Sequence, residues 1–276
     1  MRRCRGLFLA LALLSLTRMA TGEEAFITLA STTSTQNSGL FDRILPQFSA
    51  ASGIQVRVVA VGTGQAIRLA RNGDADVLLV HHRPSEDRFV AEQHGIERQD
   101  VMYNDFVIVG PAADPAGIKG MGDAAAALGK AVEAATAAAS FVFVSRGDDS
   151  GTHRKELGLW DAAGIDPSRG SGAWYRETGS GMGATLNTAS AMDAYTLADR
   201  GTWMSFKNKG ALQVMVEGDP RLFNPYGVIL VNPEKHPHIK APEGRRFVEW
   251  LTSRAGQDAI AAFKINGETL FHPNPR

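Results

Sequence analysis

Residues 141–153 read Phe-Val-Phe-Val-Ser-Arg-Gly-Asp-Asp-Ser-Gly-Thr-His, the pattern of a buried strand that ends in a glycine-bearing turn and opens a helix. The strand is the apolar run at 141–144, and Gly147 and Gly151 permit tight turns of the backbone. A polar residue at position 149, 150 or 152 can cap the helix that follows. The free N–H groups and the dipole at a helix start favour negative charge. The stretch therefore predicts a seat for an anion.

Donor side chains accompany this predicted helix start. Arg146 offers a planar fork of donors suited to an oxyanion. The hydroxyl groups beside it belong to Ser145, Ser150 and Thr152. Each hydroxyl can donate one more hydrogen bond. Taken alone, the stretch also fits a capped helix in which Arg146 only pairs with Asp148 or Asp149.

Length and charge limit the classes of function. A chain of 276 residues with 44% hydrophobic content can bury a sizeable core, which fits one or two α/β domains. Its 29 basic and 29 acidic side chains balance, so no overall field attracts nucleic acid or anionic lipid. We therefore expect no nucleic-acid partner, and any anion site must be local.

The N-terminus has the pattern of a secretory signal peptide at residues 1–22. Three arginines precede an apolar run at 7–16, and small residues end near Gly22, where we expect cleavage. No segment approaches the roughly 20 apolar residues of a permanent span. The only cysteine, Cys4, lies in the segment to be removed, so the mature chain has no disulfide and no lipid-anchor cysteine. These features predict a soluble protein of the periplasm.

Strands and helices alternate along the first third of the chain. Strands are expected at 25–30, 54–61 and 76–80. A hydroxyl-rich loop at 31–39 follows the first strand, and Gly62-Thr63-Gly64 follows the second. Such alternation indicates βαβ units, whose ligands lie at the carboxyl ends of the strands. Three strand ends here carry Ser, Thr, Gly or Arg.

Two similar apolar strands, at 105–111 and 224–233, lie far apart in the sequence and are each bounded by Gly or Pro. We interpret them as the two crossings between lobes. Lobe I then comprises 23–109 and 223–276, and lobe II comprises 110–222. In lobe II we expect a helix at 124–139, a strand at 174–177, a glycine-rich turn at 179–183 and a helix at 185–198. Closing helices follow around 248–263, and the tail from 271 is extended.

Enzyme and metal-site motifs are missing. The chain has no G-x-S-x-G elbow, and neither 62–64 nor 122–130 fits a nucleotide-binding loop. Neighbouring His81 and His82 face opposite sides of a strand and cannot readily share a cation, and His236 and His238 lie in a proline-rich turn. We expect no enzyme activity, no cofactor and no bound metal cation.

The chain resembles the tungstate-binding periplasmic proteins that feed ABC importers. The resemblance covers essentially the whole mature sequence, in the blocks 29–36, 59–65, 73–80, 101–110, 145–153, 181–187 and 223–237. The hydroxyl motif of that family, three threonines and a serine, is matched by Ser31, Thr32, Thr33 and Ser34. The resemblance implies an α/β, two-lobed periplasmic binding protein of type II. Each lobe is expected to be a mainly parallel sheet flanked by helices, with the ligand in the cleft between lobes.

The segment with Arg146 is also similar to the anion loop of phosphate-binding proteins. Those proteins place an aspartate after the third strand to accept the proton of monohydrogen phosphate, whereas this chain has Val80-His81-His82 there. A site made only of donors suits an unprotonated dianion such as tungstate. The ligand-binding residues expected from these resemblances are Thr32, Thr33, Ser34, Thr63, Ser145, Arg146, Ser150, Gly151 and Thr152.

Three alternatives stay open. Molybdate or sulfate has the same charge and donor needs as tungstate, and only the resemblance favours tungstate over molybdate. An exported hydrolase would use Ser150 or Ser180 as nucleophile and His153 as base. A sensory ligand-binding domain would need a segment that carries the signal. The preferred interpretation has tungstate as ligand, an inner-membrane ABC permease as partner, and a monomeric protein.

Overall fold

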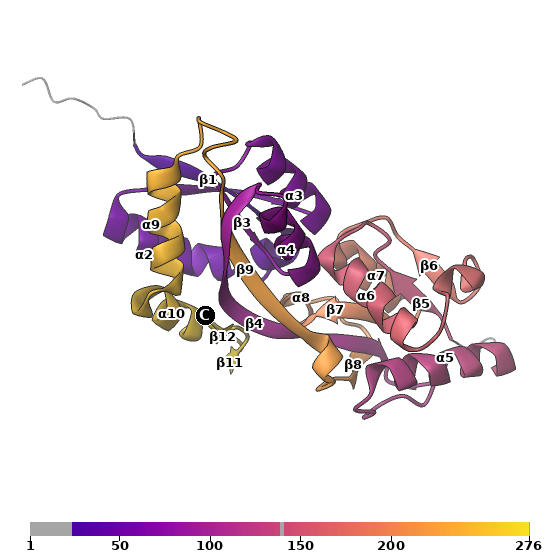
Figure 1. Ribbon diagram of the computed structural model, residues 1–276. Coiled ribbons are helices and arrows are strands. Elements are labelled where there is room, and N and C mark those ends of the chain that lie inside the picture. The colour runs from indigo at the N-terminus through magenta and orange to yellow at the C-terminus, as the bar shows by residue number, and fades with distance from the viewer. Residues whose placement is uncertain (1–23, 139–140, 276) are drawn as a thin grey trace, which may run out of the picture.

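The computed structural model describes residues 24–138 and 141–275, in which two groups of helices and strands are joined by two long strands (Figure 1). The signal peptide expected at 1–22 lies outside the described residues. No helix in the described part of the chain combines the length and the apolar character that crossing a bilayer requires.

The strands form one large sheet and two small ones. The large sheet consists of β1 (Phe26–Thr32), β2 (Gln55–Val61), β3 (Val77–Val80), β4 (Gly95–Pro111), β7 (Thr196–Asp199), β8 (Leu212–Val216), β9 (Phe223–Val231) and β12 (His272–Pro273). Its strand order is β12-β4-β9-β3-β1-β2, and β7 and β8 pair with the far part of β4. The small sheets pair β5 (Phe143–Ser145) with β6 (Tyr175–Glu177), and β10 (Lys264–Ile265) with β11 (Glu268–Thr269).

Helices cover the sheets on both faces. The α-helices are α1 (Thr33–Asn37), α2 (Leu40–Ser52), α3 (Thr63–Asn72), α4 (Arg83–Ala91), α5 (Ala124–Ala138), α6 (Gly151–Ala162), α7 (Met182–Ala191), α8 (Arg200–Ser205), α9 (Ala241–Thr252) and α10 (Arg254–Ala261). Two short 3-10 helices are η1 (Pro167–Gly170) and η2 (Pro220–Leu222).

The pairing is more mixed than the mainly parallel sheets that the sequence predicted. β1 lies in parallel between β2 and β3, as expected for βαβ units. β9 runs antiparallel to both β3 and β4, and β4 runs antiparallel to β7 and β8. The difference arises because β4 and β9 cross directly from one group to the other, without the helical crossover that parallel pairing needs.

β4 and β9 are the two crossing strands. The first part of β4 pairs with β9, in a register that sets Asn104 opposite Asn224. The last part of β4 pairs with β7 and β8, starting with Phe106 opposite Asp199. One strand thus belongs to both halves of the molecule, and Figure 1 shows it running between them. The segments expected at 105–111 and 224–233 lie in or largely in these strands.

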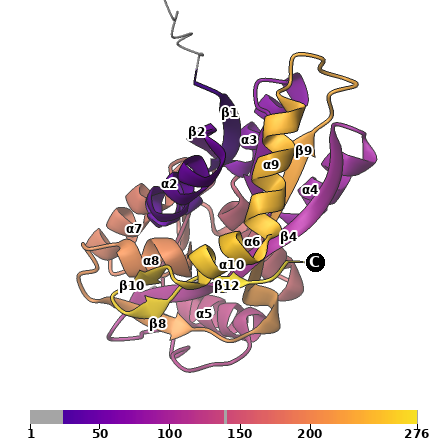
Figure 2. The ribbon, with the colours of Figure 1, turned by 90° about the vertical axis from the view of Figure 1, so that its left-hand side faces the viewer.

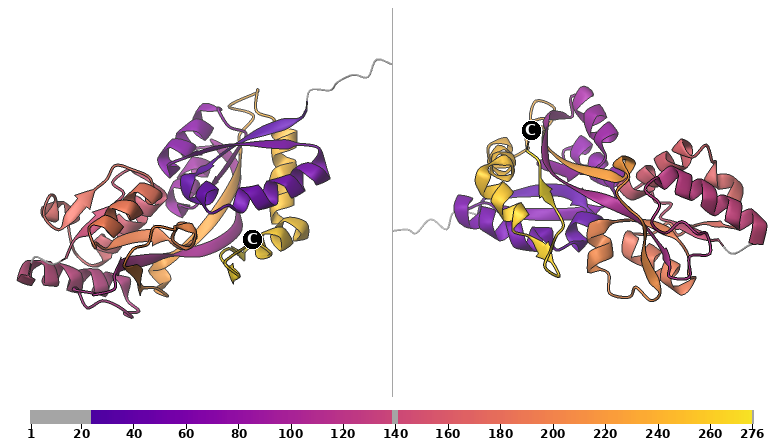
Figure 3. Two further views of the ribbon diagram at one scale, coloured as in Figure 1. Left: turned by 180° about the vertical axis from the view of Figure 1, so that it is seen from behind. Right: turned by 90° about the horizontal axis from the view of Figure 1, so that it is seen from below.

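The alternation of β3 explains why helices lie on both faces of the first half. Val77 and Leu79 belong to a buried cluster with α2, α9 and α10, which lie together in Figure 2. Leu78 and Val80 point to the other face, into a cluster with α3 and α4. Figure 3 shows these two helix layers from behind and from below. A fully apolar strand is what a sheet covered on both faces requires.

The second half repeats this arrangement around the end of β4. Phe106 and Ile108 pack with residues of α5 and α6, and Val107 and Val109 pack with residues of α7 and α8. The hydrophobic clusters of the first half draw on residues 27–102 and 226–271, whereas those of the second half draw on residues 106–222. Each half therefore has its own core.

One predicted helix is wrong in its extent. We expected a helix over 185–198, but α7 ends at Ala191 and the chain then forms β7 at Thr196–Asp199. Every residue of β7 is buried, and its backbone pairs with β4. Tertiary pairing therefore overrides the local helical pattern. The closing helices are confirmed as α9 and α10, and the tail pairs with β4 at His272.

Candidate functional site

Three strand ends and the start of α6 meet around a narrow space between the two halves of the molecule. Its lining consists of Thr32, Thr33, Ser34, Val61, Gly62, Thr63, His81, Arg146, Ser150, Gly151 and Thr152. We call this space the donor pocket. All of the predicted ligand-binding residues line it except Ser145. The rule that ligands lie at the carboxyl ends of strands therefore located the pocket.

The first half contributes hydroxyl groups at two helix starts. Thr32 ends β1 and caps α1, and its Oγ1 accepts a hydrogen bond from the Thr35 amide at 3.3 Å. The same oxygen lies 2.8 Å from the hydroxyl of Thr35. The expected loop at 31–39 is therefore mostly a short helix. Thr63 opens α3 directly after β2 and is 1% exposed.

The second half contributes the start of α6. After β5 the chain turns through Gly147 at a φ of 60° and Asp149 at a φ of 57°, both in the left-handed region. Ser150 caps α6, and its Oγ accepts from the His153 amide at 3.2 Å. Because that bond uses a lone pair, the hydroxyl hydrogen of Ser150 remains able to donate.

Arg146 fits both roles that the sequence left open, because it pairs with an aspartate and also lines the donor pocket. Its Nη2 lies 2.6 Å from Asp148 Oδ2, and its Nε donates to the same oxygen at 3.2 Å. The guanidinium is 3% exposed and also lines the donor pocket. A guanidinium has five donors, so the pair with Asp148 orients Arg146 and leaves donors for a ligand.

Thr152 carries an unused donor. Its Oγ1 is fully buried and has no hydrogen-bond partner among the described residues. A buried hydroxyl without a partner costs free energy in the folded state, so such groups usually serve a ligand or a bound water. Thr152 lines the donor pocket, so a molecule held there would meet this unpartnered hydroxyl.

The two halves touch across this pocket. The Gly151 amide donates to Thr63 Oγ1 at 3.0 Å, which joins α6 to α3. A Cβ at position 151 would lie 3.0 Å from that oxygen and 3.1 Å from Cε1 of His81. Only glycine permits this approach without a shift of the neighbours. Two groups that we expected to face the ligand therefore bond each other in this closed arrangement.

Ser145 is the predicted residue that the structure does not bring to the pocket. Its Oγ donates to Oε2 of Glu156 at 2.7 Å and accepts from the Gly147 amide at 3.2 Å. Tyr175 and Trp160 donate to the other oxygen of Glu156. Burial raises the pKa of Glu156 to about 7. The hydroxyl of Ser145 is therefore committed to supporting α6, which the count of hydroxyls in the sequence could not reveal.

Three lining residues, Val61, Gly62 and His81, are outside the predicted set, and His81 is the one among them with a polar side chain. It follows β3 directly, so the strand-end rule applies to it as it does to Thr32 and Thr63. The sequence places His81 where phosphate-binding proteins have an acceptor aspartate, but it gives the residue no role in binding and argues against a metal site shared with His82. Within the described residues, no group of three or more His, Cys, Asp or Glu side chains is placed to hold a metal ion.

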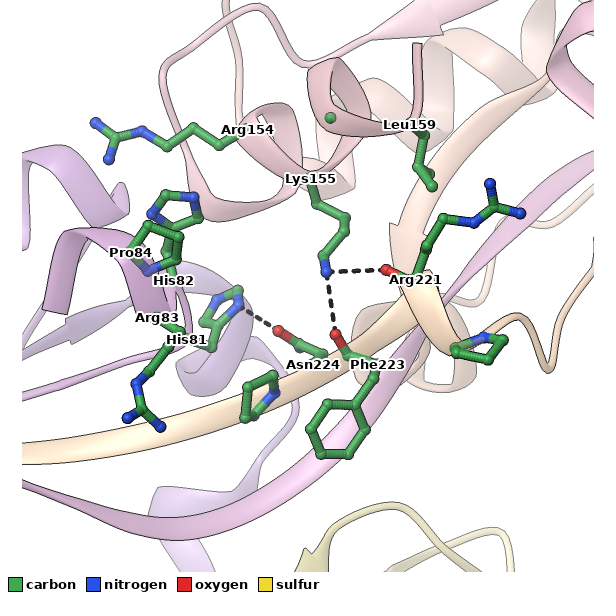
Figure 4. Close-up of a pocket in the computed structure, with 13 residues that line it drawn as sticks. His81, His82, Arg83, Pro84, Arg154, Lys155, Leu159, Arg221, Phe223 and Asn224 are labelled. Atoms are coloured by element: carbon green, nitrogen blue, oxygen red, sulfur yellow. Dashed lines mark hydrogen bonds between the residues drawn. The ribbon is translucent and has the colours of Figure 1, made fainter. Parts of the chain in front are cut away.

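A larger cleft of about 440 Å³ adjoins His81 and includes Arg83, Arg154, Lys155 and Arg221 (Figure 4). These cations already have partners. Nζ of Lys155 donates to the carbonyls of Arg221 and Phe223 at 2.9 and 3.1 Å, and burial lowers its pKa. Within the described residues, a fully buried donor without a partner lines the donor pocket and none lines this cleft, and the donor pocket contains no carboxylate among its lining residues.

The serine and histidine of the hydrolase alternative are not arranged as a catalytic pair. Ser150 meets the backbone amide of His153, while Nδ1 of that ring accepts from the Asp149 amide at 3.2 Å. Ser180 donates to the Thr178 carbonyl at 3.1 Å. General-base catalysis needs the histidine ring within reach of the nucleophile, and this geometry does not support it.

Comparisons with known proteins identify the family of the chain. A family model described as a PBP superfamily domain matches residues 19–255. The tungstate-binding protein TupA of Peptoclostridium acidaminophilum is 50% identical over 252 residues, which are 90% of this chain and 85% of the relative. The solved structure of the tungstate-binding protein TupA from Desulfovibrio alaskensis G20 is 46% identical, with a TM-score of 0.77, over 91% of this chain and 100% of that one. The crystal structure of the tungstate ABC transporter from Geobacter sulfurreducens is 47% identical, with a TM-score of 0.76, over 86% and 98%.

Proposed function

Because this chain belongs to the PBP superfamily and, within it, to the family of tungstate-binding proteins, we propose that it captures tungstate and delivers it to an ABC permease. The observation that carries this proposal is the buried, unpartnered hydroxyl of Thr152 in a lining without carboxylates. An unprotonated dianion needs donors and is repelled by acids. The donor pocket meets both conditions.

The ligand contacts in this proposal come from both halves. Thr32, Thr33, Ser34 and Thr63 hold the anion from one side, and Arg146, Ser150, Gly151 and Thr152 hold it from the other. Ser145 is left out of this set because its hydroxyl supports Glu156. On binding, the hydrogen bond between the Gly151 amide and Thr63 is replaced by hydrogen bonds from both groups to the anion. The two lobes open slightly to admit the anion and then close on it, with β4 and β9 as the hinge.

The wider context belongs to the same proposal. We take 23–109 with 223–276 as lobe I and 110–222 as lobe II; the separate hydrophobic clusters support two lobes, although residues 106–109 pack in the core of the second half. The protein acts in the periplasm as a monomer after cleavage near Gly22, and its partner is an inner-membrane permease that recognises the closed form. It performs no catalysis and requires no cofactor.

Molybdate and sulfate are the competing ligands. All three are tetrahedral dianions that use the same donors, and sulfate is the smallest. The preference for tungstate over molybdate follows from the relatives and not from the lining, because the two anions have nearly the same size.

Thermal-shift titration of the purified mature chain with tungstate, molybdate, sulfate and phosphate tests the proposal. We expect tungstate to raise the melting temperature at the lowest concentration, since a ligand stabilises the state that binds it. Phosphate should act weakest, because the lining offers no carboxylate for its proton. A shift with phosphate at equal or lower concentration than with tungstate would contradict the assignment.

A further inference from the structure

His81 lies where the donor pocket meets the larger cleft. It contributes to the lining of both spaces and is 5% exposed. Its Cε1 and Nδ1 would be 3.1 and 3.4 Å from a Cβ at Gly151, so the Cε1–Nδ1 edge of the ring faces the start of α6, and Nε2 lies on the other side of Cε1. Figure 4 shows the ring beside Asn224, below the helix that carries Lys155. An anion in the donor pocket is therefore a neighbour of this imidazole.

The imidazole is held in one orientation. Its Nδ1 lies 3.0 Å from Oδ1 of Asn224, and its ring stacks on Tyr226 with centroids 4.8 Å apart. Asn224 donates from Nδ2 to Oδ1 of Asn104 at 2.6 Å, which turns its own Oδ1 towards the histidine. Nδ1 of His81 therefore carries a hydrogen. Nε2 has no hydrogen-bond partner in the described part of the chain, so its protonation is the open variable.

The charges of the donor pocket are out of balance for a dianion. Among its lining residues, only Arg146 and His81 have side chains that can be cationic. Arg146 already shares its charge with Asp148 at 2.6 Å. A doubly charged ligand would therefore face at most one positive charge if His81 stayed neutral. A proton on Nε2 would add the second charge and one more donor.

The groups that face His81 keep it neutral without a ligand. Burial lowers the pKa of His81 from the ordinary value. The charge of Asp199, on β7, and the hydrogen bond to Asn224 raise this pKa. The charges of Arg146, directly after β5, and Lys155, on α6, lower it further. Its neighbour His82 also has a pKa lowered by burial, to about 4. A dianion in the pocket adds two negative charges to this set, and nearby opposite charge favours the protonated ring.

From this arrangement we propose that His81 contacts the bound oxyanion directly and takes up one proton from solvent when the anion binds. The proton adds to Nε2, and the new N–H donates to an oxygen of the anion while Nδ1 keeps its bond to Asn224. No covalent bond of the ligand forms or breaks. This inference rests on the proposed function and makes His81 a determinant of charge selectivity.

Calorimetry on the mature chain measures this proton. Tungstate is titrated at one pH between about 7 and 8.5, in two buffers with different ionisation enthalpies. We expect an uptake of about one proton per anion, and an affinity that falls about tenfold per pH unit across this range, because each linked proton contributes that slope. Binding with no difference between the buffers would overturn the inference and leave the proposed function standing. Absence of tungstate binding would instead refute the proposed function.

Two variants locate the proton. His81→Asn keeps a donor towards Asn224 but has no titrating nitrogen, so we expect weaker binding and no proton uptake. His82→Asn is the matched control and should behave like the wild type, because His82 bonds Ser85 and lies outside the lining of the donor pocket. Uptake that persists in His81→Asn would overturn the assignment. If that variant does not fold, NMR of the His81 ring in the wild-type chain decides, since tungstate must shift its titration to higher pH.

Discussion

The two sides of the donor pocket use the same residue types in different states. On the side of lobe I, the hydroxyl oxygens of Thr32 and Thr63 each accept a hydrogen bond from a backbone amide, and Thr63 keeps its hydroxyl hydrogen for a ligand. On the side of lobe II, the hydroxyl of Thr152 has no partner among the described residues, and Arg146 has donors beyond its pair with Asp148. The donors of a guanidinium form charge-assisted hydrogen bonds, which are roughly twice as strong as those of neutral hydroxyls. We therefore expect lobe II to supply most of the affinity and lobe I to complete the enclosure.

A buried glutamate supports each side, again in different ways. Glu86, beneath the start of α4, accepts from the His82 amide and pairs with Arg98, both at 2.6 Å. Glu156 accepts only neutral donors, from Ser145, Tyr175 and Trp160. Burial raises the pKa of both glutamates to about 7. Glu86 therefore belongs to a buried ion pair, whereas Glu156 is held by neutral donors alone.

We expect Arg146→Ala to reduce tungstate affinity more than any other variant, which tests the larger contribution of lobe II. It removes the only permanent positive charge of the lining, so we expect tungstate affinity to fall by more than about 3 kcal/mol, or over a hundredfold, given about 1.5–3 kcal/mol for each charge-assisted bond. Isothermal calorimetry measures the change. Arg169→Ala is the matched control, because that side chain is 85% exposed in η1, away from the pocket lining. Unchanged affinity in Arg146→Ala would show that the site assignment is wrong.

Glu86→Gln is expected to destabilise the fold by about 3 kcal/mol at pH 8, because it leaves Arg98 without one partner of a buried ion pair. Arg98 is 5% exposed in its side chain, and its Nη2 already has no partner in the described residues. Asp100 keeps its own bond to Arg98 and limits the loss. Urea unfolding measures the free energy, and Glu97→Gln, exposed on the same strand, is the control. Equal stability of the two variants would contradict a structural role for the pair.

This ion pair also shows what the sequence could not supply. The last part of β4 was predictable, because 105–111 is apolar. The whole strand is 17 residues long, however, and it also includes the polar run at 97–100. Those residues read as a loop until the partner is known, since Arg98 becomes acceptable in a strand only through Glu86 and Asp100. Partners distant in sequence decide such cases.

The candidate site was more predictable than the fold boundaries. Thr32, Thr63 and Arg146 each follow a strand, and one topological rule brings such residues together. The rule does not distinguish a hydroxyl that faces the pocket from one that faces the interior, which is why Ser145 was misplaced. It also covers any residue type, so His81 was within its reach but lacked a chemical signal of its own.

The pH dependence of folding stability in Glu156→Gln tests the difference between the two buried glutamates. The folded pKa of about 7 lies above the ordinary value of 4.5, so the folded protein binds more protons than the unfolded chain between these values. The wild type should therefore lose stability as pH rises from about 5 to 8, by about 2 kcal/mol from this group. Glu156→Gln removes that loss. Thermal melts across this range measure it, and identical pH slopes for the two proteins would exclude ionisation of Glu156 as the cause.

Thr152→Val and Thr63→Val test the smallest difference, between a free hydroxyl and a bonded one. Thr152→Val removes a buried donor that lacks a partner, so tungstate affinity should fall by about 1 kcal/mol while stability without ligand is unchanged or slightly higher. Thr63→Val also removes the acceptor of the Gly151 amide, so both affinity and stability should fall. Calorimetry and thermal melts on both variants separate the two cases, with the exposed Thr269→Val as control. If Thr152→Val loses as much stability as Thr63→Val, its hydroxyl has a structural partner and is not reserved for the anion.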